Sequence, residues 1–404
     1  FFTLEGISPK IVKLTFLLKV MAGCALGIIY THYYTDGDTI KFFEDSSVMF
    51  NALHTNPKHF MEMLTGINGD AEHLYQYYEK MNAWNNKDVL FNDNKTIIRL
   101  NVIFQFFSMG HYYVHVVFLN FLSFAGLVAL CKLFQSYVKN KSIELFFGVM
   151  LLPSVLFWGS GLLKDGLLLF GMGMLLFNFN KIVLSKQTAK TIILLTVFFL
   201  LLVFTKLYTI VCMLPGLIAW YWSRNDSVKQ IILKFFFCYS VYIVLGFSIG
   251  AINDKYDVAD IIYFKQKNFQ EFAKQAAAKS IIQIPTIEPT FLSILANSPS
   301  AIFRVLTRPT FFDSHSPLIF LAALENLLIL FIIIFCFIKA KRNGNINLPI
   351  FWFSVFFFLT MFALIGIITP VLGAIVRYKV PVLPFLMFIF IALYNKKGNI
   401  KQVH

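Results

Sequence analysis

Three short stretches of this chain carry side chains that could act together on a phosphorylated substrate. They are Asp36-Gly-Asp38, the segment from Trp158-Gly-Ser-Gly161 to Lys164-Asp165, and Arg377-Tyr378 ahead of a Pro-x-x-Pro. A carboxylate can accept a proton from a hydroxyl group, and Lys and Arg bind phosphate oxygens. On one side of a membrane these groups would form a reaction site, whereas dispersed they would be ordinary loop residues.

The composition is typical of a membrane protein. Of the 404 residues, 58% are hydrophobic and 14% are charged, with a mean hydropathy of +0.69. Soluble domains are about half apolar and about one quarter charged, so the composition excludes an ordinary water-soluble enzyme. The net charge of +14 comes mostly from short Lys and Arg clusters beside apolar runs. This distribution follows the positive-inside rule and requires no nucleic-acid partner.

Apolar runs of about 20 residues, the length that crosses a bilayer, recur along the sequence. They predict an all-α polytopic bundle of about ten spans that forms a single integral-membrane domain over residues 1–404. The expected spans lie at roughly 11–30, 114–134, 143–160, 163–180, 190–205, 207–223, 231–252, 317–339, 350–369 and 371–394.

Basic clusters at every second boundary predict the orientation, with the N-terminus in the cytoplasm. The clusters are Lys139-Asn-Lys141, Lys181 to Lys190, Arg224 to Lys229, Lys339 to Arg342 and Lys396-Lys397. The outer side then carries two long loops, about 31–113 and 253–316. We expect the first span to be retained, because no small-residue cleavage site of a signal peptide follows it.

Both outer loops show helical patterning. In the first loop, three segments mix apolar and charged residues at helical spacing, and a fourth is expected to form an amphipathic helix at the membrane interface. These segments are Thr39–Leu53, Lys58–Leu64, Ala71–Trp84 and Ile97–Tyr112. In the second loop, Tyr263–Ile284 is expected to be helical, and the prolines that follow it are expected to interrupt regular structure.

Asp36 and Asp38 follow the first span, and two interpretations of them stay open. Asp and Gly form turns, and acids begin helices well. Alternatively, a carboxylate at the membrane surface acts as a general base or holds a divalent cation. The sequence has no His/Cys metal-binding motif, and the five cysteines lie in or beside apolar segments without a CxxC pair. We therefore expect the cysteines to be buried thiols, neither disulfides nor metal ligands.

Basic residues in other outward turns are candidate phosphate ligands. Lys164 begins a predicted helix, where the dipole favours an anion over a cation, and a bound phosphate would resolve this conflict. Arg377 lies inside the last apolar run, where an arginine usually faces the bundle interior or a polar cavity. The further candidates are Asp165, Lys206, Tyr208, Arg304, Arg308 and Tyr378. The alternative interpretation is interfacial anchoring and solvated loop residues.

These features together resemble the GT-C-fold glycosyltransferases that use polyprenyl-linked sugars. The resemblance is architectural, extends over most of the chain and rests on the acid after the first span, the long helical outer loop, the basic turns and the late Arg377-Tyr378. It implies a transferase of the bacterial inner membrane whose active site faces the periplasm or exterior. The expected substrates are a polyprenyl-phosphate sugar donor and a glycan or lipid acceptor.

The same resemblance implies the roles of individual residues. Asp36 or Asp38 would be the catalytic base or a metal ligand, and Lys164, Lys206 and Arg377 would bind the lipid phosphate. The chain departs from the usual pattern, because its first loop has no clean Asp-Asp or Glu-Asp pair directly after the first span, and Glu44-Asp45 lies two turns further on. No soluble C-terminal domain follows the bundle either. The metal requirement is therefore left open.

Two other functions are compatible with the sequence. An O-antigen-type polymerase or ligase, acting on undecaprenyl-diphosphate glycans, would rely on outer-loop arginines rather than on an essential acid. A lipid or solute transporter is the non-enzymatic alternative. Transporters usually contain paired repeats and helices broken near the middle of the membrane, and the sequence shows no internal repeat.

Overall fold

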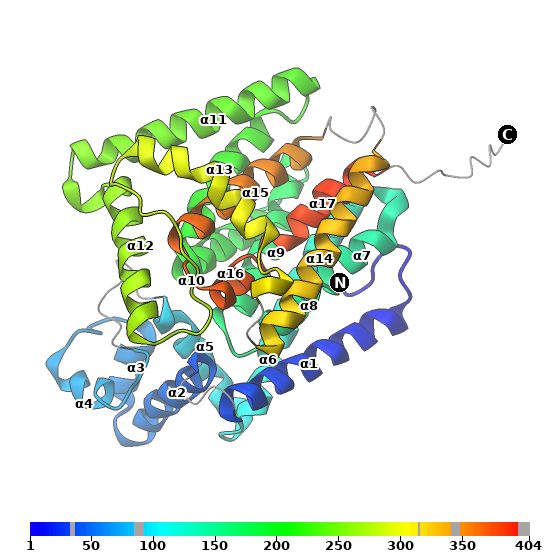
Figure 1. Cartoon of the computed structure of the whole chain (residues 1–404). Helices are drawn as coiled ribbons and strands as arrows, with labels where there is room; N and C mark the ends of the chain where they lie inside the picture. The colour runs from blue at the N-terminus through cyan, green and yellow to red at the C-terminus, as the bar shows by residue number, and fades with distance from the viewer. Residues whose placement is uncertain (33–36, 85–92, 314–315, 341–347, 395–404) are drawn as a thin grey trace. The chain divides into compact units, whose positions relative to one another are not determined.

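The computed structural model describes residues 1–32, 37–84, 93–313, 316–340 and 348–394 (Figure 1). Within these ranges, all regular elements are helices. The strand-like pairings there are two isolated bridges, Ile281 with Val371 and Ala340 with Tyr394. The all-helical prediction is therefore confirmed for the part of the chain that the structure describes.

Seven helices of the described ranges are long and apolar enough to cross a membrane, and a bent helix pair would make eight. They are α1 (Pro9–His32), α6 (Tyr112–Tyr137), α9 (Lys164–Val183), α10 (Ala189–Trp222), α11 (Val228–Ser248), α14 (Pro317–Ile338) and α15 (Pro349–Ile368). The bent pair consists of α16 (Leu372–Tyr378) and α17 (Leu383–Leu393), whose axes differ by 63°.

The count of seven to eight differs from the ten expected spans because one expected span is split into short helices and two others are joined in one helix. The run at 143–160 forms two short helices, α7 (Ser142–Met150) and α8 (Pro153–Trp158). Pro153 has no N–H to continue the first helix and restricts the residue before it. The runs at 190–205 and 207–223 join in α10, where Lys206 departs from helical geometry with φ −153° and ψ 89°.

The chain divides into two compact units that interleave along the sequence. Unit 1 comprises Phe1–Leu133 and Val155–Ile210, and unit 2 comprises Phe134–Ser154 and Val211–His404. Each unit therefore combines sequence-distant segments.

The first of the two long loops belongs to unit 1, and its apolar side chains share one core with residues of α1, α6 and α9. Its helices, drawn in blue to cyan in Figure 1, are α2 (Asp38–Thr55), α3 (Pro57–Thr65), η1 (Glu72–Leu74), α4 (Tyr75–Tyr78) and α5 (Asn94–Ser108). Phe42, Met49, Met63 and Trp84 are each at most 3% exposed. The helical prediction for this loop is confirmed, although 71–84 contains only short helical pieces.

A buried carboxylate fixes the end of this loop. Asp45 is completely buried and accepts hydrogen bonds from the backbone N–H groups of Asn82 (2.7 Å) and Ala83 (2.8 Å). Burial raises the pKa of Asp45, and these backbone donors oppose the rise by favouring the charged form. Asp45 thus joins α2 to the segment that carries Trp84.

The second outer loop belongs to unit 2 and differs in part from the prediction. Its first helix, α12 (Val258–Gln275), begins earlier and ends earlier than expected, and Asp257 caps it by accepting from Ala259 N and Asp260 N. The stretch around Pro285 and Pro289 is irregular, as expected, and a second helix, α13 (Phe291–Thr307), follows with Pro299 inside it. The expected interruption at Pro299 was wrong: α13 continues through it and packs closely on α15, where a Cβ at Gly366 would meet the backbone of Ala301.

In unit 1, α6 and α9 approach one another through two glycines. A Cβ placed at Gly173 would collide with the backbone of Gly126, and one at Gly126 would collide with the backbone of Leu169 and Phe170. Small residues permit this kind of backbone contact between membrane helices. The close approach depends on the absence of both side chains.

We therefore expect Gly173→Ala to destabilise the protein by about 1–3 kcal/mol through overpacking. The matched control is Gly246→Ala in α11, where an added Cβ meets nothing nearer than Val258 Cγ2 at 4.0 Å. Thermal unfolding of both variants in detergent measures the difference. Equal unfolding temperatures would contradict the close contact between α6 and α9.

Candidate functional site

Unit 1 gathers several of the predicted site residues at the ends of four helices. We call this group the lysine–carboxylate cluster, and its members are Asp38, Asp93, Lys164, Asp165 and Lys206. Asp38 begins α2, Asp93 precedes α5, Lys164 and Asp165 begin α9, and Lys206 lies at the kink of α10. The cluster therefore brings together residues from positions 38 to 206.

The Lys206–Asp165 ion pair is the most buried contact of this cluster. Lys206 Nζ lies 3.0 Å from Asp165 Oδ1, and the side chains are 6% and 0% exposed. The Tyr208 ring lies beside the same ammonium, 5.9 Å from Nζ to the ring centroid. Removing one charge from such a pair leaves the other without compensation in an apolar setting.

Lys164 is also engaged by the protein itself. Its Nζ donates to Asp93 Oδ1 at 2.6 Å and to Asn94 Oδ1 at 2.8 Å, and Asp38 and Lys206 both lie within electrostatic range. The expected conflict between a lysine and a helix N-terminus is thus relieved by carboxylates of the chain, since Asp165 also lies in the first turn of α9. Two lysines face three carboxylates here, so the cluster does not favour a phosphate.

The structure describes one of the two candidate catalytic acids. Asp38 is exposed at the first position of α2, close to Lys164, where a carboxylate also suits the helix dipole. Asp36 lies outside the described residues. The structure therefore places one acid of the pair, Asp38, within the lysine–carboxylate cluster.

Lys19 is a buried residue that sequence reasoning missed. This lysine of α1 is fully buried and donates to Gly159 O (2.5 Å) and Ser160 Oγ (3.0 Å). Asn120 and Ser123 of α6 donate to the carbonyls of Ser160 and Gly159, both at 2.8 Å. The turn before Lys164 is therefore held by polar contacts from α1 and α6. A lysine well inside an apolar run was the available sequence signal.

Unit 2 holds a second group of predicted residues, at the C-terminal end of α13. Arg304 Nη1 donates to Gly366 O at 3.0 Å, and Arg308 Nη1 lies 3.4 Å from Asp313 Oδ1. Burial and the like charge of Arg308 both lower the pKa of Arg304. Within the described residues, Arg304 bonds to a carbonyl and to no carboxylate.

The break between α16 and α17 adds a buried cation to this region. Lys379 is 2% exposed, and its Nζ donates to Asn326 Oδ1 at 2.8 Å and to Arg308 O at 3.4 Å. Glu325, the adjacent acid of α14, accepts hydrogen bonds from Ser154 N (2.9 Å) and Ser154 Oγ. We call Arg304, Arg308 and Lys379 the unit 2 cation group.

The remaining predicted residues lie near that break. Arg377 is half-buried in the last turn of α16, two residues before Lys379, and Tyr378 packs against Phe269 of α12 with ring centroids 6.4 Å apart. Arg304 also lines a small pocket with Gln266 and Gly366, no larger than about one water molecule. The predicted residues therefore form one group within each unit.

The described residues do not assemble a metal site. Among them, no group of three or more His, Cys, Asp or Glu side chains is placed to hold a metal ion. No chemical step is therefore assigned to the divalent cation that the resemblance leaves open.

We expect Lys206→Met to destabilise the protein by about 3–5 kcal/mol, because it removes the ion-pair partner of the buried Asp165. The double replacement Lys206→Met with Asp165→Leu should recover most of that loss, since it removes both charges. Thermal unfolding in detergent measures both effects. Lys234→Met is the control, because Lys234 and Asp226 form a more exposed pair (24% and 19%) and should cost at most about 1 kcal/mol.

No family model matches the chain, and no curated protein or solved structure matches it either. Its function is therefore inferred from its own side chains and their geometry.

Proposed function

We propose that the chain is a membrane glycosyltransferase that moves a sugar from a polyprenyl-phosphate donor to a glycan or lipid acceptor on the extracytoplasmic face. The observation that carries this proposal is the unit 2 cation group. Among the described residues, Arg304 has no carboxylate partner and Arg308 lies beside the Asp313 carboxylate. In the same part of the chain, Lys379 donates to two neutral oxygens and has the Glu325 carboxylate within electrostatic range. An excess of cations beside apolar helices suits a lipid-linked phosphate.

In the proposed reaction, the acceptor hydroxyl oxygen forms a bond to the anomeric carbon as the bond from that carbon to the donor phosphate oxygen breaks. The leaving phosphate keeps the electron pair, and Arg304, Arg308 and Lys379 stabilise its charge. The hydroxyl proton passes to a carboxylate of the chain. The resemblance to GT-C enzymes, and no observed contact, assigns this role to Asp38 or Asp36. The bacterial inner membrane, with both outer loops outside, is part of the proposal and rests on the basic cytoplasmic clusters.

The transporter alternative gains support from the broken helices. Transporters bind substrates where discontinuous helices expose polar groups. Here α7 and α8, α10, and α16 and α17 are interrupted, and each interruption lies beside a buried polar contact. These contacts are Ser154–Glu325, Lys206–Asp165 and Lys379–Asn326. This alternative predicts substrate uptake without a glycan product.

The purified chain in liposomes, given labelled polyprenyl-phosphate sugars and envelope extracts, should transfer label to the acceptor fraction. Arg304→Gln should lower transfer by about 100-fold or more through loss of charge stabilisation. Lys265→Gln, an exposed lysine of the same loop, is the control and should leave the rate unchanged. Uptake of a labelled solute or lipid without transferred label would replace the proposal with the transporter alternative.

Replacement of the two acids distinguishes the proposed glycosyltransferase from the polymerase or ligase. Asp38→Asn or Asp36→Asn should lower transfer by about 100-fold, because the acceptor loses its proton acceptor. The measurement is the initial rate of label transfer, with the unfolding temperature as a control for folding. Full activity in both variants, together with loss of activity in Arg304→Gln, would favour the polymerase or ligase.

A further inference from the structure

The helix α13 of the second long loop has two apolar faces, and unit 2 covers one of them. This inner face lies beside α15, where the backbone of Ala301 approaches Gly366 so closely that a Cβ would not fit between them (Figure 1). Ile294, Ala301 and Val305 of the inner face are at most 8% exposed. The inner face therefore belongs to the interior of unit 2.

The outer face of α13 is exposed in the described part of the chain. Leu292 is 73% exposed, Leu295 52% and Phe303 67%. We call the face the outer stripe, and its members, which follow one another at helical spacing, are Leu292, Leu295, Ala296, Pro299 and Phe303. The nearest charged residues along the chain are Glu288, before the helix, and Arg304 in its last turn. The charges thus stand at the two ends of the stripe and not along it.

The polar side chains of α13 are bonded within the helix. Four of them donate to backbone carbonyl oxygens one turn back, and the pairs are Asn297 with Ser293 (2.9 Å), Ser298 with Ile294 (2.7 Å), Ser300 with Asn297 (2.9 Å) and Thr307 with Phe303 (2.8 Å). In hydrocarbon, polar groups need partners inside the protein because no water replaces them. These four side chains meet that condition.

The preceding helix of the same loop, α12, has a different exterior. Its exposed positions combine two aromatic side chains with charged ones, and they include Phe264, Lys265, Lys267, Glu271, Phe272 and Lys274. A helix that faces water carries polar and charged residues on its outer side. The second long loop therefore contains one helix whose exterior suits water and one whose exterior is apolar.

The outer stripe lies between the exposed faces of two helices that are long and apolar enough to cross a membrane. At the start of α13, Phe291 packs against Phe247 of α11, with ring centroids 5.0 Å apart. Beyond its end, Phe311 packs against Phe320 of α14, with ring centroids 5.8 Å apart. Exposed apolar side chains flank both contacts, and they are Val244, Leu245, Phe312, Leu321 and Leu324. An apolar surface shared with spanning helices fits lipid acyl chains, since such helices present these faces to the bilayer.

We propose that α13 lies in the hydrocarbon of one membrane leaflet, with its outer stripe against lipid acyl chains, and not in water. A helix of 17 residues is about 25 Å long, which is less than the roughly 30 Å of a bilayer core. The helix therefore enters the membrane without crossing it. Arg304 and Arg308, at its C-terminal end, then reach the depth of the lipid phosphate groups, where arginine side chains are stable.

Photo-crosslinking of the full chain in lipid nanodiscs tests the lipid contact. A benzoylphenylalanine replaces either Phe303 in α13 or Phe272 in α12, which are matched because they are 67% and 65% exposed. After irradiation, mass spectrometry should find lipid adducts about tenfold more often at position 303, in line with the preference of an aromatic side chain for apolar surroundings. Equal adduct yields at the two positions would overturn the proposal. Adducts of position 303 with a second copy of the chain, and not with lipid, would replace it with self-association.

A charge on the outer stripe gives an independent measurement. Leu295→Lys should lower the unfolding temperature in nanodiscs by about 5 °C or more, because a lysine against acyl chains is costly. Phe264→Lys is the matched control, since Leu295 and Phe264 are 52% and 51% exposed, and it should leave the temperature unchanged. An unchanged temperature in Leu295→Lys would place α13 in water.

Should Leu295→Lys not be recovered in folded form, the crosslinking at Phe303 decides alone, because that variant exchanges one exposed aromatic ring for another. The inference rests on the apolar exterior of α13. Neither measurement uses transfer activity, so their outcome is separate from that of the proposed function.

Discussion

A buried charged side chain needs a polar partner, and several buried lysines of this chain have their partners at or near breaks in helices. Lys206 abandons helical geometry in the middle of α10 and pairs with Asp165 at the start of α9. Lys379 lies in the gap between α16 and α17 and reaches Asn326. Lys19 bonds to the carbonyl that follows α8. Lys19 thus bonds to backbone freed at a helix end, whereas Lys206 and Lys379 bond to polar side chains of other helices.

The two units use their cations in different ways. In unit 1, Lys164 and Lys206 are matched by three carboxylates, so the electrostatic need is met inside the protein. In unit 2, the charges of Arg304 and Arg308 repel one another, and Asp313 lies beside Arg308. A cation that leaves its charge uncompensated is the better candidate for an anionic ligand. Basic residues that look alike in a sequence thus differ in what they can bind.

Much of the fold could be predicted from local sequence, because apolar length and helical spacing are local properties. The spans at α1, α6, α9, α11, α14 and α15 and the helices α2, α3 and α5 were predicted near their observed positions. The break at Pro153 was not predicted, because hydropathy is continuous across it, and the boundary expected at Lys206 is a kink within α10. The helix α13 was missed because Pro299 pointed to a loop, whereas the segment is helical through Pro299 and packs on α15.

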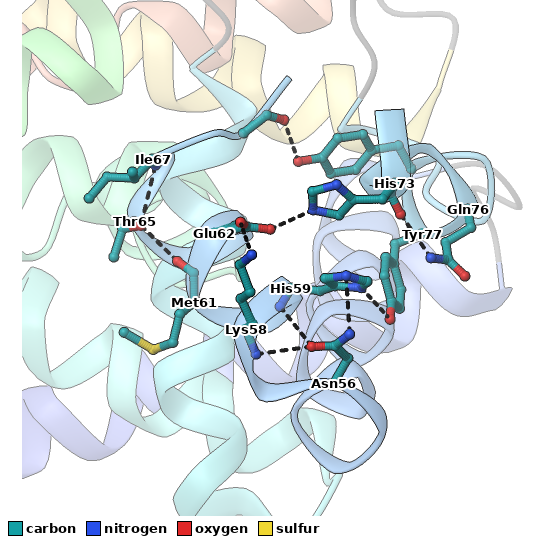
Figure 2. A network of polar contacts seen from close by, with 12 residues as sticks. Asn56, Lys58, His59, Met61, Glu62, Thr65, Ile67, His73, Gln76 and Tyr77 are labelled. Carbon is teal, nitrogen blue, oxygen red and sulfur yellow. Dashed lines mark hydrogen bonds and ion pairs between the residues drawn. The ribbon is translucent and has the colours of Figure 1, made fainter. Parts of the chain in front are cut away.

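The candidate site was less predictable than the fold. Residue types at turns singled out Lys164, Asp165 and Lys206, which the structure places in one cluster, but Asp93 as the partner of Lys164 carried no motif. The hydrogen bond of His73 with Glu62 (Figure 2) was not predicted either, because it joins η1 to α3 and follows no sequence motif. Pairing of this kind follows from tertiary geometry, which one sequence does not encode in any local pattern.

The contact between Lys141 and the end of α17 has a consequence for the order in which the molecule is assembled. Lys141 donates to the carbonyls of Ile391 (2.6 Å), Ala392 and Tyr394, at the negative end of that helix dipole. During translation, the ribosome must add some 250 further amino acids before this ammonium meets those carbonyls. Until then α7 lacks the C-terminal end of α17 as its packing partner, so unit 2 completes its folding after unit 1.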